Sequence, residues 1–243
     1  MDTIKFDKGT IKMIAHRGLS AIERENTCPA FVAAANRSYW GIETDIHVTA
    51  DGKFVVIHDE TPERVSGGAW TLNVEESTAE QLQQVLLHDL DGSTHRPDIR
   101  LPFLEDYIAI CKKYGKVAVL ELKNLFPEDQ VARVVEELRR LEYLEGTVFI
   151  SFKWDNCVAL RKLLPEHKIQ YLVGSAGVTQ EKIDKMIAHR FDLDVRGDML
   201  SKNTVDQMHA AGLEVNVWTI DKPEYAEMLK VMGVDYITTN ILE

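Results

Sequence analysis

The sequence predicts an α/β protein and, within that class, a (β/α)₈ TIM barrel with a small insertion after the second strand. Short β-rich runs alternate with amphipathic segments of about ten to fifteen residues, which is the pattern of parallel βαβ units. Eight such runs can be found. The chain has 243 residues, close to the roughly 250 of one closed barrel. An open, doubly wound sheet is the alternative.

The predicted strands are short and mostly apolar. They comprise residues 12–16, 41–46, 117–122, 147–151, 169–173, 191–195, 213–218 and 235–239. Between them, the apolar periodicity predicts helices at 28–38, 103–114, 128–142, 154–164, 179–189, 201–211 and 222–232. Two of these helices carry a proline at their start: Pro127 precedes Glu128, and Pro223 lies at the beginning of the last helix.

Residues 47–102 interrupt this alternation. Asp51-Gly52 lies between two β-like stretches and is typical of a tight hairpin, which we expect to lie outside the barrel. A capping box, Ser77-x-x-Glu80, predicts a short helix over 78–88. We therefore expect one domain, residues 1–243, with an insertion at about 47–102. A loop this long after a barrel strand usually serves function.

Composition limits the class of partner. Hydrophobic residues make up 45% and charged residues 28%, as in an ordinary globular protein. The net charge of −11 argues against nucleic acid or an anionic membrane as a partner. The sequence has no signal-peptide pattern and no run long enough to span a bilayer. Three widely spaced cysteines favour a reducing compartment, so we expect a cytoplasmic protein without stable membrane insertion.

Carboxylates on two of the predicted strands point to a metal site. In the second strand the apolar residues share one face, which leaves Glu43 and Asp45 on the other, inside the barrel. The same alternation places Glu121 and Lys123 inside the third strand. Three carboxylates at one barrel mouth form an all-oxygen cluster that suits one hard divalent cation, Mg²⁺ or Ca²⁺. The alternative is that they only form ion pairs with Lys123 or Arg17.

Two histidines lie where barrel enzymes place catalytic groups. His16 ends the first strand, and His58 ends the predicted hairpin. Since imidazole titrates near neutral pH, the pair could act as general acid and general base. His47, although nearby, lies one residue past the apolar face and is left out of the predicted site.

Cations and one aromatic residue complete the candidate site. Arg17 could bind phosphate oxygens through its guanidinium, and Lys123 adds a point charge. Trp218 ends the seventh predicted strand, beside Asn216 on the inward face, where it could pack or contact a ligand. Glu25, Asn26 and Thr27 are interpreted as the cap of the first helix.

At this point the residues match a known family. The chain resembles the bacterial glycerophosphodiester phosphodiesterases over nearly its whole length. The matching segments, in family order, are AHRG at 15–18, ENTCPAF at 25–31, IETDIHVTADGKFVVIHD at 42–59, LPFLED at 101–106, LELK at 120–123, SF at 151–152, GLEVNVWT at 212–219 and DYITTN at 235–240. Two positions depart from the family pattern: Phe103 replaces a common Thr, and Asn240 ends a motif that usually reads Thr-Asp-x-Pro.

The resemblance implies a TIM barrel, which agrees with the strand pattern, and it implies roles for particular residues. The catalytic histidines would be His16 and His58, and Trp218 would line a glycerol pocket. The metal ligands would be Glu43, Asp45 and Glu121, and the phosphate-binding cations Arg17 and Lys123.

The implied reaction is hydrolysis of a small-molecule glycerophosphodiester to sn-glycerol 3-phosphate and an alcohol, with one divalent cation. Two alternatives stay open: a related barrel phosphodiesterase that acts on lysophospholipid-type substrates and releases a cyclic phosphate, and a catalytically silent binding module. The sequence leaves open the choice of Mg²⁺ or Ca²⁺, the head-group alcohol and which histidine is the acid. It also leaves open whether water or a glycerol hydroxyl is the nucleophile, and whether the chain forms a homo-oligomer.

Overall fold

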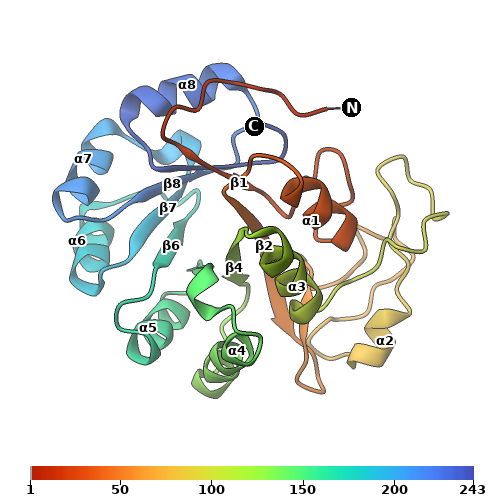
Figure 1. The fold of residues 1–243 in the computed structure, drawn as a ribbon. Coiled ribbons are helices and arrows are strands. Elements are labelled where there is room, and N and C mark those ends of the chain that lie inside the picture. Colours follow the sequence, from red (N-terminus) through yellow and green to blue (C-terminus); the bar gives the residue numbers. More distant parts are fainter. Residues whose placement is uncertain (1) are drawn as a thin grey trace.

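The computed structural model describes residues 2–243, and its centre is a closed parallel barrel (Figure 1). Within these residues the barrel has eight strands: β1 (Lys12–Ala15), β2 (Gly41–Val48), β4 (Val117–Leu122), β5 (Thr147–Ser151), β6 (Ile169–Val173), β7 (Asp192–Arg196), β8 (Val215–Trp218) and β9 (Tyr236–Thr239). Because β1 pairs with both β2 and β9, the sheet closes on itself. The predicted TIM-barrel fold is therefore confirmed, and the open sheet is excluded.

Helices follow the strands and cover the outside of the barrel (Figure 1). They are α1 (Cys28–Ala35), α3 (Leu104–Tyr114), α4 (Glu128–Arg140), α5 (Trp154–Leu163), α6 (Gln180–His189), α7 (Lys202–Ala210) and α8 (Pro223–Met232). Thr27, Thr179 and Ser201 cap three of them, because each side chain accepts a hydrogen bond from a backbone N–H in the first turn. Helix α1 is shorter than its predicted range, 28–38, and ends at Ala35.

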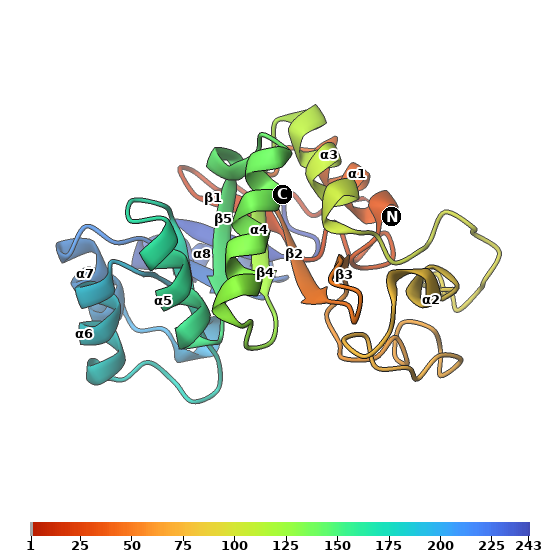
Figure 2. The same cartoon turned by 90° about the horizontal axis from the view of Figure 1, so that it is seen from below.

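The hairpin predicted at Asp51-Gly52 is present. Strand β3 (Phe54–Val56) pairs antiparallel with the end of β2, with Ile46 opposite Val56, and it does not pair with another barrel strand. Gly52 has φ +77°, a backbone conformation that glycine adopts without strain. Figure 2 shows β3 and α2 on one side of the barrel, away from α6 and α7.

The helix predicted at 78–88 is wrong in its length and its cap. Helix α2 (Ala79–Gln83) is capped by Thr78, whose side chain forms the capping box with Gln81 instead of the predicted Ser77 and Glu80. From Val85 the chain forms neither helix nor strand, and burial alternates from Val85 to Leu87. These side chains join a small cluster of the insertion, which explains why the helix stops: Val55, Ile57, Val65, Val74, Leu82, Val85, Leu87, Ile99 and Leu101.

The apolar residues divide as the strand alternation predicts. Ile42, Ile46 and Leu120 pack in the large cluster between the strands and the helices. Ile14 and Val119 belong to a separate cluster inside the barrel. These two cores pack against opposite faces of the barrel sheet, which fixes which side chains point inward. In the part of the chain described, no helix has the length and apolar character required to cross a membrane.

Candidate active site

The candidate site lies at the carboxyl ends of the barrel strands. Here a narrow pocket of about 50 Å³ is bounded by residues of β2, β4, β5, β6, β7, β8 and β9, by residues that directly follow β1, β4 and β5, and by His58 of the insertion. Its lining consists of His16, Arg17, Glu43, His58, Glu121, Lys123, Ile150, Phe152, Leu172, Asp194, Trp218 and Thr238. In TIM barrels this end carries the active site.

Strands β2 and β4 bring the three predicted carboxylates together. Asp45 pairs with Glu121 in the register of the two strands, and Glu43 lies two residues before Asp45 on the same face. One oxygen of each carboxylate lies within 4.8 Å of the others. All three side chains are buried, with Glu43 3%, Asp45 1% and Glu121 5% exposed. Such a cluster is costly unless cations neutralise it.

Two protein cations neutralise part of this charge. Lys123 Nζ lies 3.0 Å from Glu121 Oε1 and 3.4 Å from Asp45 Oδ1, and Arg17 Nε lies 3.5 Å from Asp45 Oδ2. The ion pairs weighed as the alternative explanation of the carboxylates therefore exist. However, two side-chain cations face three carboxylates, so one negative charge of the cluster is left without a cation when all three are ionised.

The pKa values of the carboxylates reflect this imbalance. Burial and the neighbouring Asp45 raise the pKa of Glu43 well above its usual value, and the same causes raise that of Glu121 to about 8. Burial also acts against ionisation of Asp45, but Lys123 and Arg17 outweigh it and hold the pKa of Asp45 low. Without a further cation, the three carboxylates do not all ionise at neutral pH.

The donor set fits a hard divalent cation. Every ligand is a carboxylate oxygen, the type that Mg²⁺ and Ca²⁺ prefer. Asp45 Oδ1 is buried and makes no hydrogen bond to any residue from 2 to 243. The other oxygen, Oδ2, accepts a 2.8 Å hydrogen bond from Asn26 Nδ2, which fixes the carboxylate. Glu43, Asp45 and Glu121 would therefore hold the ion.

The His-Arg-Gly turn after β1 places Arg17 beside this cluster. Arg17 has φ +55°, a strained conformation for a residue with a side chain. Its backbone N–H donates to Glu43 Oε2 over 2.7 Å, and its carbonyl accepts from the Asn26 N–H over 2.9 Å. At Gly18, a Cβ would lie 2.7 Å from the Ala30 carbonyl carbon, so only glycine fits against helix α1. The turn therefore positions the guanidinium at the pocket.

His16 is fixed by a chain of hydrogen bonds from the end of β9. Asp221 Oδ2 accepts from Asn240 Nδ2 over 2.7 Å, so the amide oxygen of Asn240 faces His16. That oxygen accepts from His16 Nδ1 over 2.8 Å. The imidazole therefore carries its proton on Nδ1, and Nε2 is the basic nitrogen. Burial and the Arg17 charge lower the pKa of His16 to about 4.

His58 has a different partner, a carboxylate. Asp59 Oδ1 accepts from His58 Nδ1 over 2.6 Å. Arg64 Nε donates to Asp59 Oδ2 over 2.7 Å, and its two terminal nitrogens donate to both oxygens of Glu25. Glu25 in turn accepts from Arg17 over 2.8 Å. Arg64, in the insertion, thereby connects the neighbours of a candidate catalytic histidine and of a candidate phosphate-binding arginine. Burial lowers the pKa of His58.

The far side of the pocket is largely apolar. Trp218 packs edge-on against Phe152, with ring centroids 5.6 Å apart. Leu172 and Ile150 complete this wall, and Asp194 is buried among the residues that line it. The tryptophan thus lies in the pocket, at the position that the sequence predicts.

The structure brings the predicted residues of the site into one region. The sequence analysis assigned no role at the site to Asn240 or Asp59 and interpreted Glu25 and Asn26 only as part of a helix cap. Their neighbours in the sequence carried the motif, but the contacts that define their roles come from other elements. His47, left out of the site, is buried and lies 3.0 Å from Glu75, while its Nε2 is 3.4 Å from the His58 carbonyl.

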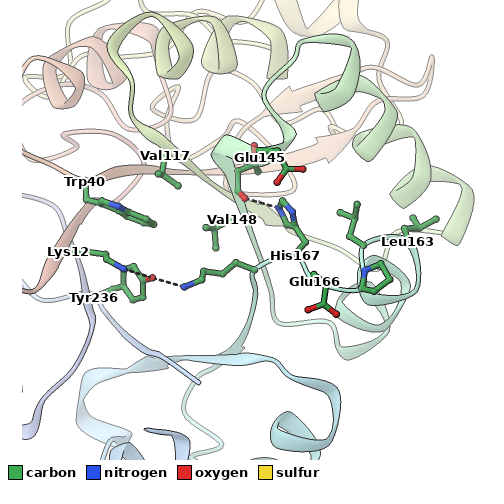
Figure 3. A pocket seen from close by; sticks show the side chains of 13 residues that line it. Lys12, Trp40, Val117, Glu145, Val148, Leu163, Glu166, His167 and Tyr236 are labelled. Atoms are coloured by element: carbon green, nitrogen blue, oxygen red, sulfur yellow. Dashed lines mark hydrogen bonds between the residues drawn. The ribbon is translucent and has the colours of Figure 1, made fainter. Parts of the chain in front are cut away.

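A wider cavity of about 580 Å³ lies at the opposite end of the barrel (Figure 3). Lys12 and Lys168 both hydrogen-bond to the Tyr236 hydroxyl there, at 3.2 and 2.9 Å. Glu214 also lies at this end, where it accepts a hydrogen bond from the same hydroxyl over 2.6 Å. It is therefore not part of the carboxylate cluster of the candidate site. In TIM barrels, packing and ion pairs at this end contribute to stability, whereas catalysis takes place at the other end.

The candidate site thus combines an acidic cluster, two imidazoles and two cations at the mouth of a (β/α)₈ barrel. The sequence model of the Glycerophosphoryl diester phosphodiesterase family matches residues 16–243. The chain belongs to this family. The family resemblance and the enzyme class predicted from the sequence are thereby confirmed.

Individual relatives agree over nearly the full length. The glycerophosphodiester phosphodiesterase of Caldanaerobacter subterraneus subsp. tengcongensis is 26% identical over 236 residues, which cover 94% of this chain and 93% of the relative. A solved glycerophosphodiester phosphodiesterase from Parabacteroides distasonis is 28% identical, with a TM-score of 0.76 and coverage of 95% and 93%. The Oleispira antarctica phosphodiesterase, solved with the product sn-glycerol-3-phosphate, shares the fold at a TM-score of 0.86, with 24% identity and coverage of 98% and 96%.

Proposed function

We propose that this protein hydrolyses glycerophosphodiesters to sn-glycerol 3-phosphate and an alcohol, with Glu43, Asp45 and Glu121 holding one Mg²⁺ or Ca²⁺ ion. The observation that carries the proposal is the buried carboxylate cluster beside His16 and His58, with an Asp45 oxygen that makes no hydrogen bond within the described residues. When bound, the cation would supply Lewis-acid charge neutralisation at a phosphate oxygen.

The protein's own side chains have distinct tasks in this proposal. Arg17 and Lys123 bind the remaining phosphate charge and stabilise the additional charge of the transition state. Trp218 packs against the glycerol part of the substrate. The substrate is a small molecule, and no part of the proposal requires a nucleic acid or a membrane.

The partners of the two histidines support a division of roles. His16 has a neutral amide partner, Asn240, and keeps Nε2 free of a proton, so it acts as the base. His58 has the anionic Asp59 as partner, which opposes the lowering of its pKa by burial, so of the two histidines it is the one assigned as the acid. In the hydrolysis, the water oxygen forms a bond to phosphorus as the bond to the alcohol oxygen breaks. His16 takes the water's proton, and His58 gives one to the departing alkoxide.

The test is release of glycerol 3-phosphate from a panel of glycerophosphodiesters, with the protein in chelator and again after Mg²⁺ or Ca²⁺ is restored. We expect release that chelator abolishes and one of the two ions restores. Release of equal rate in chelator, or no release from any diester, contradicts the proposal. The second result is the one expected of a silent binding module.

One observation keeps the cyclic-phosphate alternative worth testing. A lipid substrate requires an exposed apolar surface near the mouth, and Phe152 of the pocket wall is 37% exposed. Phosphorus NMR of the product mixture separates the two reactions. We expect glycerol 3-phosphate to appear directly, whereas a persistent cyclic phosphate supports the alternative.

A further inference from the structure

Two polar atoms in the pocket wall are buried without a partner. Asp194 Oδ1 and Trp218 Nε1 make no hydrogen bond to any residue from 2 to 243. Asp194 lies on β7 and Trp218 on β8, the neighbouring strand, and both line the pocket. One atom accepts hydrogen bonds and the other donates them. Leaving both unpaired in a buried place costs stability, so the wall is built for something other than the folded chain alone.

The other inward aspartate of the same strand provides a contrast. Asp192 Oδ1 accepts a 2.8 Å hydrogen bond from the Glu214 N–H, and Asp192 Oδ2 lies 3.9 Å from Lys168 Nζ. Asp194 is 2% exposed, and the lining around it includes Leu172 and Ile150. Asp192 thus has partners within the protein, whereas the free oxygen of Asp194 has none among the residues described.

The strand order fixes where Asp194 stands relative to the carboxylate cluster. Strand β7 is four strands away from β2 in either direction around the barrel. Asp194 therefore faces the cluster of Glu43 and Asp45 from across the pocket. A substrate whose phosphate is held at the cluster would extend its far end toward Asp194 and Trp218.

We propose that Asp194 determines specificity by accepting a hydrogen bond from the terminal hydroxyl of the substrate's glycerol, while Trp218 Nε1 donates to the same oxygen. A hydroxyl both donates and accepts, so it satisfies both unpartnered atoms at once. A quaternary ammonium has no N–H and therefore cannot donate to Asp194. This inference rests on the proposed function and names the part of the substrate that the pocket reads.

The ionisation of Asp194 agrees with such a contact. Burial raises the pKa of Asp194 to about 8. At neutral pH the carboxyl is therefore mostly uncharged and can pair with a hydroxyl without the cost of a buried charge.

The experiment compares two substrates. One is glycerophosphocholine; the other is its analogue with a 2-hydroxypropyl group, which lacks only the terminal hydroxyl. Wild type should prefer glycerophosphocholine in kcat/KM by about 10- to 100-fold, as expected for a hydrogen bond left unmade in a buried site. Asp194→Leu should reduce this preference to about threefold or less by slowing glycerophosphocholine alone. Asp194→Asn, which keeps a carbonyl oxygen, should restore part of it.

Asp192→Asn is the matched control, since it changes a buried aspartate of the same strand outside the pocket, and it should keep the full preference. The thermal midpoint of Asp194→Leu should not fall, because that variant removes an unpartnered buried carboxyl. A preference that survives in Asp194→Leu, or equal slowing of both substrates, overturns the inference. If wild type cleaves both substrates equally, the inference fails and the proposed function stands. If it cleaves neither of these nor any other diester of the panel, the proposed function itself fails.

Discussion

Asn240 Oδ1 accepts a hydrogen bond from His16 Nδ1 over 2.8 Å, which joins the residue after the last strand of the barrel to the residue after the first. Ser20 Oγ donates to the same oxygen over 2.7 Å, and Asp221 holds the amide nitrogen. The amide can therefore face His16 in one orientation only. This hydrogen bond fixes the proton on Nδ1 and favours the protonated ring, but burial and the Arg17 charge outweigh it and keep the pKa of His16 low.

Replacing this amide by a carboxylate should shift the pH dependence of the enzyme. In Asn240→Asp, a negative charge next to His16 raises the pKa of its imidazole from about 4. The base is then protonated over a wider pH range, so the acidic limb of the kcat profile should move to higher pH. Asn240→Ala should lower kcat by about 10- to 100-fold without moving that limb upward. A superimposable profile in Asn240→Asp contradicts the role given to Asn240.

Loss of either catalytic histidine should remove most of the activity. His16→Ala and His58→Ala should each lower kcat at least about a hundredfold, since general acid–base catalysis contributes about 10²–10⁴ in rate. Circular dichroism should show an unchanged fold. His95→Ala, on the exposed surface of the insertion, is the control and should keep wild-type kcat. Wild-type kcat in either site variant rules out its assigned role.

The insertion should influence catalysis through Arg64. In Arg64→Ala, the hydrogen bonds to Glu25 and Asp59 are lost, so the two carboxylates that position Arg17 and His58 are no longer held in place. We expect kcat/KM to fall about tenfold or more, as is usual when the partners of active-site groups are removed. Arg64→Lys should recover part of it.

Arg96→Ala is a matched control for Arg64. Arg96 also connects the insertion to the segment before α1, through an ion pair with Glu23 at 2.6 Å. Neither Arg96 nor Glu23 lines the pocket. Its removal should leave kcat/KM unchanged. An equal loss in both variants means that the insertion acts through general stability.

The buried carboxyl of Asp194 should make the stability of the metal-free protein depend on pH. Its pKa is raised to about 8 in the folded state, so the folded protein binds more protons than the unfolded chain between about pH 4 and pH 8. Stability is therefore lost as pH rises through this window, by up to about 1.4 kcal/mol per pH unit.

Asp194→Asn should remove that loss. Urea unfolding in chelator, at several values between pH 5 and pH 8, should show the variant gaining stability over wild type as pH rises. The gain should level off above pH 8. A difference that stays constant with pH means that Asp194 is ionised throughout.

The barrel was predictable because the alternation of apolar and polar residues in a strand shows which side chains face the helices and which face the barrel interior. In β2, the apolar Ile42 and Ile46 alternate with Glu43 and Asp45, and period-two burial turns that pattern directly into an inside and an outside. The metal cluster follows from the same rule applied to β4. Local patterns therefore predicted both the fold and the carboxylates.

The supporting contacts were not predictable in this way. Asn240 meets His16 only because β9 closes the barrel against β1, and no local pattern encodes that pairing. From the sequence, Asn26 was interpreted only as part of a helix cap. In the structure its backbone is left-handed, with φ +54°, and its side chain donates to Asp45. The predicted length of helix α2 was wrong because the side chains of Val85 and Leu87 pack into the cluster of the insertion, and the helix ends at Gln83.

The central claim is that the carboxylates of Glu43, Asp45 and Glu121 share one divalent ion, and crystals soaked with calcium test it most directly. The account predicts one strong density peak about 2.3–2.6 Å from an oxygen of each carboxylate. It also predicts that the peak disappears in Glu121→Gln. Density that shows only Lys123 and Arg17 against these oxygens, with no ion among them, contradicts it.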